Sequence, residues 1–203
     1  MIDTPLGPAR VLTDGSNDPA GTLVLGGGAG GGVDAPDLAA VTAAAAGAGW
    51  RVLRVEQPWR VAGRRIAPAP ARLDVGWTAV LDRLRADGRL TGPLVFGGRS
   101  AGARVACRTA QAQGADGVLA LAFPLHPPGR PERSRAAELI AVPVPVLVVQ
   151  GERDPFGGPG EIAEAAPAVT VRAVPGDHSL RAGLEALPTA VLPWLALVAG
   201  RRG

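Results

Sequence analysis

The sequence predicts an α/β fold in a single domain, with a mostly parallel sheet that is covered by helices on both faces and carries no cap domain. Short apolar runs alternate along the chain with longer, alanine-rich runs of helical period. Hydrophobic residues make up 47% of the 203 positions, which is enough to bury one sizeable core. The 29 glycines and 20 prolines follow no repeating period and therefore indicate many turns between short elements.

Six short apolar runs, bounded by glycine, proline or polar residues, predict strands. They lie at 22–25, 51–55, 94–96, 118–121, 144–150 and 169–174. The segments between and after them carry helical patterns at 37–46, 72–87, 101–113, 134–139, 161–165 and 187–197. Strands that alternate with helices require right-handed crossovers, and these crossovers place parallel strands in one sheet that is buried on both faces.

Proline and glycine mark the boundaries of these elements. Pro36 opens the first helix and Gly47 closes it, which is the usual asymmetry of helix ends. Clusters of the same residues predict two loops, at 57–71 and 123–133. Pro188 and Pro193 predict a break in the last helix. The expected organisation is one domain over residues 1–203, with its core at about 20–198 and a frayed tail at 200–203.

The composition argues against several classes of protein. All 21 basic residues are arginines scattered among 18 acidic ones, so we expect no nucleic-acid partner. The single cysteine, Cys107, and an N-terminus without an apolar signal run predict a cytoplasmic location. The apolar stretch at 191–199 is short and interrupted by Pro193, so no membrane span is expected. The histidine and cysteine pattern predicts neither a metal nor a cofactor.

The strongest chemical signal is the segment GRSAG at 98–102, which lies between a predicted strand and a predicted helix. A serine on such a tight turn needs small neighbours, because its backbone is strained and the strand and helix approach closely. With 29 glycines in the chain, chance gives the four serines roughly 0.08 matches to this pattern. Ser100 is therefore predicted to be a nucleophile.

A serine hydroxyl needs a base and an acid before it can attack. His178 follows the last predicted strand, which is where a serine on such a turn receives its base. We therefore prefer His178 to His126. Asp154 lies just beyond the strongest predicted strand and is the preferred acid, with Glu152 and Asp177 as rivals. The chain order of serine, aspartate and histidine agrees with this assignment.

The negative charge of a tetrahedral intermediate needs backbone N–H donors. One is expected from Ala101, directly after the nucleophile, and the other from Ala29 in the glycine-rich loop at 26–32. Gly28 and Arg99, beside these donors, are assigned to the substrate-binding surface.

Two further residues belong to that predicted surface. His126 follows a strand end and is expected over the site entrance, with substrate contact and loop packing both open. Trp59 either lines the pocket or covers the core.

The glycine-rich loop also matches a dinucleotide-binding pattern. GxGxxG occupies 26–31, and Glu56 follows 56 − 31 = 25 residues later. We disfavour this interpretation because the predicted helix begins only at Pro36, so a pyrophosphate would not lie on its N-terminus. A phosphate-binding P-loop requires a lysine, and the chain has none.

Five segments carry a family resemblance: LVLGGGAGGGVDAPDL, GGRSAGAR, LAFPLHPPGRPE, VLVVQGERDPFG and GDHSL. Over roughly residues 20–198 they resemble the small lidless α/β-hydrolases of the KANL/Tex type, distant relatives of dienelactone hydrolases. The resemblance implies that Ser100, Asp154 and His178 take the triad positions. Many relatives have His-Gly where this chain has Gly27-Gly28, which implies a more flexible loop here.

The sequence thus predicts a serine hydrolase that acts on a small-molecule ester or thioester through an acyl-enzyme. The first alternative, implied by the same resemblance, is a catalytically weak binding or scaffold protein. The second is a nucleotide-binding oxidoreductase. The segment 122–143 is too rich in proline and charge to build an apolar cap, so we expect a preference for short acyl groups.

Overall fold

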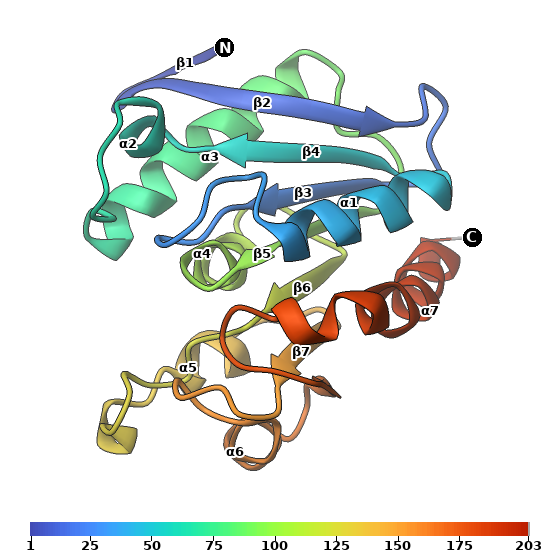
Figure 1. Cartoon of the computed structure of the whole chain (residues 1–203). Helices are drawn as coiled ribbons and strands as arrows, with labels where there is room; N and C mark the ends of the chain where they lie inside the picture. Colours follow the sequence, from blue (N-terminus) through green and yellow to red (C-terminus); the bar gives the residue numbers. More distant parts are fainter. Residues whose placement is uncertain (203) are drawn as a thin grey trace.

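Eight strands form one sheet in the computed structural model, which describes residues 1–202 (Figure 1). They are β1 (Ile2–Thr4), β2 (Gly7–Gly15), β3 (Thr22–Gly26), β4 (Arg51–Glu56), β5 (Leu94–Arg99), β6 (Gly117–Leu121), β7 (Val146–Gly151) and β8 (Thr170–Val174). Their order across the sheet is β1-β2-β4-β3-β5-β6-β7-β8. β2 pairs antiparallel with β1 and β4, and the other neighbours are parallel. The predicted mostly parallel sheet is confirmed.

Helices connect these strands. The α-helices are α1 (Pro36–Gly47), α2 (Pro58–Val61), α3 (Pro70–Ala86), α4 (Ala101–Thr109), α5 (Ala136–Ile140), α6 (Pro159–Ala165) and α7 (Leu187–Ala199). Short 3₁₀ helices are η1 (Pro131–Arg133), η2 (Arg181–Ala186) and η3 (Gly200–Arg202). A frayed tail was expected at 200–203; η3 occupies most of that segment, and Gly203 lies outside the described residues.

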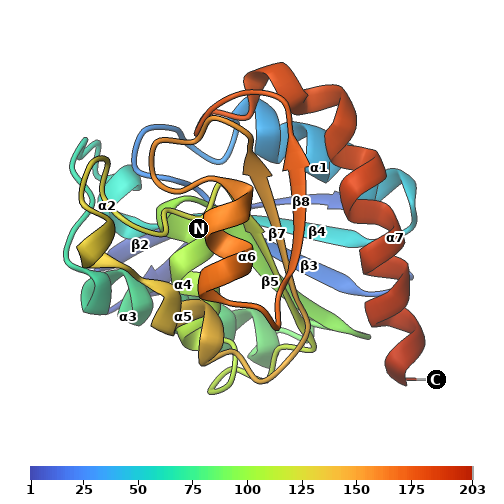
Figure 2. The ribbon, with the colours of Figure 1, turned by 90° about the horizontal axis from the view of Figure 1, so that it is seen from below.

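The helices cover both faces of the sheet (Figure 2). α1 and α7 pack on one face, and α3 and α4 pack on the other. Along β5, Val95 packs on the face covered by α1 and α7, whereas Phe96 packs on the face covered by α3 and α4, where its ring meets Trp77 edge to face at 6.0 Å. Successive side chains of a strand point to opposite faces, so a strand buried on both sides is apolar at every position.

The last helical segment of the chain is strongly apolar. Arg181–Ala199 is long and apolar enough to cross a membrane by length and composition alone, with a hydropathy of 1.5. In the structure, α7 packs one face against α1 and β7. Its buried side chains are Leu187, Val191, Trp194, Leu195 and Val198. The predicted break at Pro193 is wrong, because α7 continues through this exposed residue.

Three other elements differ from the sequence expectation. The β1–β2 hairpin was not predicted, because β2 is an outer strand in which polar side chains such as Arg10, opposite Glu56, interrupt the apolar pattern. α2 lies inside the predicted loop at 57–71 and begins with Pro58, a favourable first helical residue. The helix predicted to run to 113 ends at Thr109.

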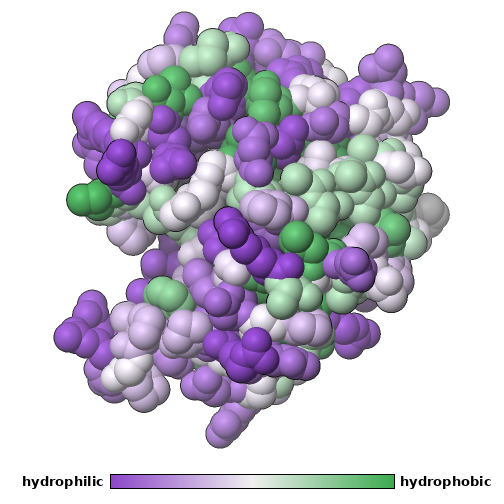
Figure 3. Space-filling model, viewed as in Figure 1, coloured by the Kyte–Doolittle hydropathy of each residue, from purple (hydrophilic) through white to green (hydrophobic). Residues whose placement is uncertain are grey.

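The carboxyl ends of the parallel strands meet at one edge of the molecule, on the left in Figure 1. In the space-filling view this edge is indented above a lobe at the lower left, where the chain leads into α5 (Figure 3). Residues 122–143 form a loop, η1 and α5, and build no cap over the edge. Ligands of open α/β sheets bind at this edge.

The centre of that edge depends on a very close backbone contact between β3 and the start of α4. A Cβ on Gly102 would lie 2.3 Å from the carbonyl oxygen of Gly26, and one on Gly98 would lie 2.4 Å from the same oxygen. These distances are shorter than any side chain tolerates. Glycine at both positions therefore permits the strand and the helix to touch.

We expect Gly102→Ala to lower the free energy of unfolding by about 1–3 kcal/mol, because the backbone of Gly26 must move to admit the methyl group. The matched control is Gly160→Ala, at the second position of α6 as Gly102 is at the second position of α4, where a Cβ meets nothing within 4 Å. This control should change stability by less than about 1 kcal/mol. Urea unfolding measures both, and equal midpoints would contradict the packing argument.

Candidate active site

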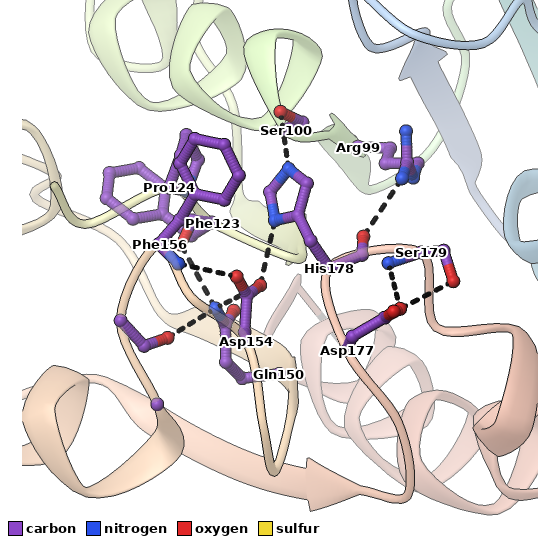
Figure 4. A network of polar contacts seen from close by, with 12 residues as sticks. Arg99, Ser100, Phe123, Pro124, Gln150, Asp154, Phe156, Asp177, His178 and Ser179 are labelled. Atoms are coloured by element: carbon purple, nitrogen blue, oxygen red, sulfur yellow. Dashed lines mark hydrogen bonds and ion pairs between the residues drawn. The ribbon is translucent and has the colours of Figure 1, made fainter. Parts of the chain in front are cut away.

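Three side chains from three loops converge at the carboxyl edge of the sheet (Figure 4). Ser100 follows β5, Asp154 follows β7 and His178 follows β8. The Nε2 atom of His178 lies 3.0 Å from Oγ of Ser100, and its Nδ1 atom lies 2.8 Å from Oδ2 of Asp154. An ionised carboxylate only accepts, so Nδ1 donates to it. The lone pair of Nε2 is then free to accept the serine hydroxyl.

The backbone of Ser100 is strained. Its φ is +53° and its ψ is −109°, in a region that residues other than glycine rarely adopt. Its N–H donates to the carbonyl of Leu121, and its own carbonyl accepts from Arg104 in α4. Strain of this kind costs about 1–3 kcal/mol and persists only where the surroundings enforce it. The strained turn leaves the hydroxyl at the carboxyl edge of the sheet.

Asp154 is held in place by donors besides His178. Its side chain is fully buried. Oδ1 accepts the N–H of Phe156 at 2.8 Å, and Oδ2 accepts the side-chain amide of Gln150 at 2.8 Å. These bonds fix the orientation of the carboxylate toward the imidazole.

Gln150 is a site residue that the sequence reasoning missed. It is fully buried at the end of β7, and its Nε2 also lies 3.2 Å from the carbonyl of Phe123 and 2.8 Å from that of Gly157, so its two N–H groups are shared among three acceptors. The amide thus ties the loop after β6 to the loop that carries Asp154. A polar residue at the end of an otherwise apolar strand run was the available signal.

Phe156 was also missed. Its ring lies against the imidazole of His178, with centroids 4.3 Å apart and planes tilted by 34°. The loop after β7 therefore holds the imidazole twice, through the carboxylate of Asp154 and through this ring contact.

The rival acids lie elsewhere. Asp177 is exposed and accepts from the N–H and hydroxyl of Ser179, and these bonds hold the pKa of its carboxyl below the usual range. Glu152 is exposed. Asp154 is therefore the carboxylate that the structure brings to His178.

The glycine-rich loop passes over the serine. A Cβ on Gly28 would lie 3.4 Å from Cβ of Ser100 and 3.1 Å from Nη1 of Arg99, so this position accepts no side chain without movement. Ala29, the predicted donor, directly follows Gly28. Ala101, the other predicted donor, is the first residue of α4, where backbone N–H groups lack helical partners.

A pocket with about 340 Å³ of space, part of it open to solvent, lies beside this loop. Its apolar walls are Val33, Val55, Trp59, Leu73, Ala101 and Val105, and Gly28 also lines it. Trp59 is buried, lines this pocket and also packs in the hydrophobic core.

Arg99 contacts the protein itself. Its Nε lies 2.8 Å from Oδ2 of Asp37, and its Nη2 donates to the backbone carbonyl of His178 at 2.9 Å. Asp37 is almost fully buried in the first turn of α1. Burial raises the pKa of the Asp37 carboxyl, and the Arg99 guanidinium opposes that rise.

His126 also contacts the protein. Its Nδ1 lies 3.0 Å from the carbonyl oxygen of Pro127, and its Nε2 lies 3.0 Å from Oε2 of Glu161 in α6. Because both ring nitrogens face acceptors, the doubly protonated ring fits this place best, and the two bonds raise the pKa of His126 above 6.5. The backbone N–H of His126 donates to the carbonyl of Phe156. All of these contacts of His126 are therefore with neighbouring loops and with α6.

Two other features of the sequence have structural explanations. Glu56, the acid of the dinucleotide pattern, forms an ion pair with Arg10 at 2.8 Å, and α1 begins 36 − 31 = 5 residues beyond Gly31. Cys107 is buried in α4, and burial raises the pKa of its thiol to about 12. It is therefore no competing nucleophile near neutral pH.

Comparisons with known proteins agree with this architecture. Residues 19–186 match the family described as "Alpha/beta hydrolase domain". No curated protein sequence is significantly similar to the chain.

Many solved structures share the fold. One is an α/β serine hydrolase homologue from Coxiella burnetii, with 17% identity and a TM-score of 0.78, covering 96% of this chain and 95% of that one. Another is an α/β serine hydrolase without a lid from Xanthomonas campestris, with 23% identity, a TM-score of 0.75 and coverage of 95% and 92%. A third is a thermophilic esterase from Thermogutta terrifontis, with 16% identity, a TM-score of 0.72 and coverage of 98% of both chains.

The ion pair of His126 and Glu161 predicts a pH-dependent contribution to stability. The raised pKa of His126 stabilises the fold below pH 6.5, and this contribution disappears as the pH rises through the folded value. Hydrogen bonds from Gly158 and His126 lower the pKa of Glu161, so its contribution is present above pH 4.5 and lost as the pH falls through the lowered value. The pair should therefore contribute most between these pH values, by at most about 1 kcal/mol because Glu161 is exposed.

The chain has two histidines, so NMR titration of the imidazole signals resolves this directly. Glu161→Gln, which keeps an acceptor for the N–H of Gly158, should lower the midpoint of the His126 titration and remove the excess stability at pH 5.5. An unchanged His126 midpoint in this variant would contradict the assignment.

Proposed function

The chain belongs to the α/β-hydrolase domain family, and we propose that it hydrolyses a small ester or thioester through a covalent acyl-enzyme. The observation that carries this proposal is the continuous hydrogen-bonded chain from Ser100 through His178 to Asp154. The order of these three residues in the sequence and their positions after strands of the sheet fit the family.

In the proposed mechanism, Oγ of Ser100 attacks the acyl carbon while Nε2 of His178 takes the hydroxyl proton. Asp154 stabilises the imidazolium that forms and keeps its orientation. When the tetrahedral intermediate collapses, the bond to the leaving group breaks and the imidazolium returns the proton to the leaving oxygen or sulfur. A water molecule then attacks the acyl-serine with His178 as base, which releases the acid and restores the serine.

The developing oxyanion needs donors that already point at it. We assign one to the N–H of Ala101, because it begins α4 beside the nucleophile. We assign the other to the N–H of Ala29, because Gly28 brings this loop against Ser100. Trp59 and the apolar walls around it are the proposed acyl site.

The finer classification is part of the same proposal. The motifs of the chain support membership of the lidless KANL/Tex-type group, distantly similar to dienelactone hydrolases. We also propose a cytoplasmic enzyme that needs no metal or cofactor and whose partner is its small-molecule substrate.

A fluorophosphonate probe should label the wild-type protein and fail to label Ser100→Ala, because the phosphorus is attacked by an activated serine hydroxyl. Ser134→Ala is the matched control, since Ser134 lies on an exposed loop before α5 and should be dispensable. Equal labelling of wild type and Ser100→Ala would overturn the assignment. A folded wild-type protein without labelling would favour the binding or scaffold alternative.

The same assay distinguishes the acid. Asp154→Asn should lower the acylation rate by about 10⁴-fold, because the amide favours the wrong tautomer of His178. Asp177→Asn should leave the rate within a few-fold, because that carboxylate contacts its own loop. The reverse ranking would show that the wrong acid was chosen.

The enzyme should prefer short acyl groups, because residues 122–143 supply no apolar cap and the pocket is small. Each methylene that is buried adds about 0.8 kcal/mol, or about fourfold in kcat/KM, only while apolar walls enclose it. For p-nitrophenyl esters from C2 to C16, we expect kcat/KM to level off beyond roughly C4 to C6. A steady rise through C12 would contradict this.

A substitution tests the pocket itself. Leu73→Ala should move the optimum toward longer chains, because Leu73 lines the pocket. Leu84→Ala is the control from the same helix, since Leu84 is a fully buried core residue outside the pocket lining. It should lower stability without moving the optimum.

A further inference from the structure

Arg99 is a nearly buried cation at the candidate site that takes no part in the acyl-transfer steps. Its side chain is 13% exposed, and two of its nitrogens face acceptors of the protein itself. Nε faces Asp37 at 2.8 Å, and Nη2 faces the backbone carbonyl of His178 at 2.9 Å. Figure 4 shows the guanidinium reaching from the residue before Ser100 to the backbone of His178.

The partner carboxylate fixes the direction of this guanidinium. Asp37 is 1% exposed, and its other oxygen accepts the N–H of Leu38 at 2.9 Å. A buried arginine beside a buried carboxylate has little freedom to turn toward solvent, because leaving would strand an uncompensated charge. The charge of Arg99 is thus balanced within the protein.

The loop that receives this hydrogen bond follows β8, the last strand of the sheet. β8 is largely exposed and pairs on one side only, with β7. The carbonyl bonded to Arg99 belongs to His178 itself. Arg99 in turn immediately precedes Ser100, so one side chain joins the backbone of the base to the backbone of the nucleophile.

We propose that Asp37 and Arg99 are a positioning pair that sets the separation between the imidazole of His178 and the hydroxyl of Ser100. The inference rests on the proposed function and adds two residues to it. A displacement of about 1 Å between reacting groups lowers rates by about 100-fold. The pair therefore acts on kcat through His178 without touching the substrate.

A different role for Arg99, contact with an anionic group of the substrate, makes a different prediction. Loss of such a contact would raise KM for anionic esters and leave neutral esters unaffected. Loss of the positioning pair lowers kcat for both kinds of ester and leaves KM within about twofold.

The test is the double variant Asp37→Leu with Arg99→Met. Removing both charges leaves no unpaired buried ion, so the fold should be retained. With p-nitrophenyl acetate we expect kcat to fall by about 10- to 100-fold at constant KM. Imidazole NMR supplies a readout that needs no turnover: the Nδ1 proton of His178, held by Asp154, should exchange faster with water.

The matched control is Asp74→Leu with Arg108→Met, a similar half-buried pair between α3 and α4, whose loss should leave kcat and the proton signal unchanged. If the double variant at the site does not fold, Arg99→Lys replaces it. Lysine keeps the positive charge beside Asp37 but lacks the forked guanidinium that also reaches His178. This variant should show the same loss of kcat and the same faster exchange of the Nδ1 proton. Wild-type kcat and wild-type proton exchange in either folded site variant would overturn the proposal. Should wild type prove inactive on esters, the exchange measurement still decides for or against the pair.

Discussion

The contact between the end of β3 and the first turn of α4 determines the geometry of the whole site. Gly26 touches Gly98 and Gly102 at distances that exclude any Cβ, so strand and helix meet backbone to backbone. This contact forces the connecting residue, Ser100, into its positive φ. The chain that leaves β3 then passes directly over the serine at Gly28. Ser100 and the glycine-rich loop are therefore positioned by one and the same packing contact.

The other half of the site lacks such a contact and depends on side chains. Asp154 and His178 lie on loops after β7 and β8, toward the end of the sheet. A buried amide, Gln150, fixes the acid, and the ring of Phe156 fixes the imidazole. These are directional contacts that need each partner in place, so single substitutions in this half should affect catalysis more than stability. Substitutions at the contact between Gly26, Gly98 and Gly102 should instead affect stability more than catalysis.

This division explains what the sequence could reveal. Ser100, Asp154 and His178 each follow an apolar strand run, and parallel topology brings such positions to one edge, so the convergence was predictable. The bond from Arg99 to the carbonyl of His178 joins residues 79 positions apart, and no local pattern encodes it. The β1–β2 hairpin escaped prediction for a related reason: an outer strand alternates polar and apolar side chains weakly. The residues of each local motif could be identified from the sequence, whereas the contacts between loops could be identified only from the structure.

The chain uses arginine and no lysine, and the structure shows what the guanidinium groups contribute. A guanidinium presents five N–H donors in a rigid fork, so it can hold two acceptors in different directions at once. Arg99 does so at the site, and Arg108 does so with Asp74 and Glu138 between helices. A lysine ammonium on a flexible stem would fix neither direction. Because residues 122–143 build no cap, packing from above cannot hold the loops that carry Asp154 and His178. The buried fork of Arg99, which salt screens far less than a partly exposed pair such as Arg10 and Glu56, holds the loop after β8 from within.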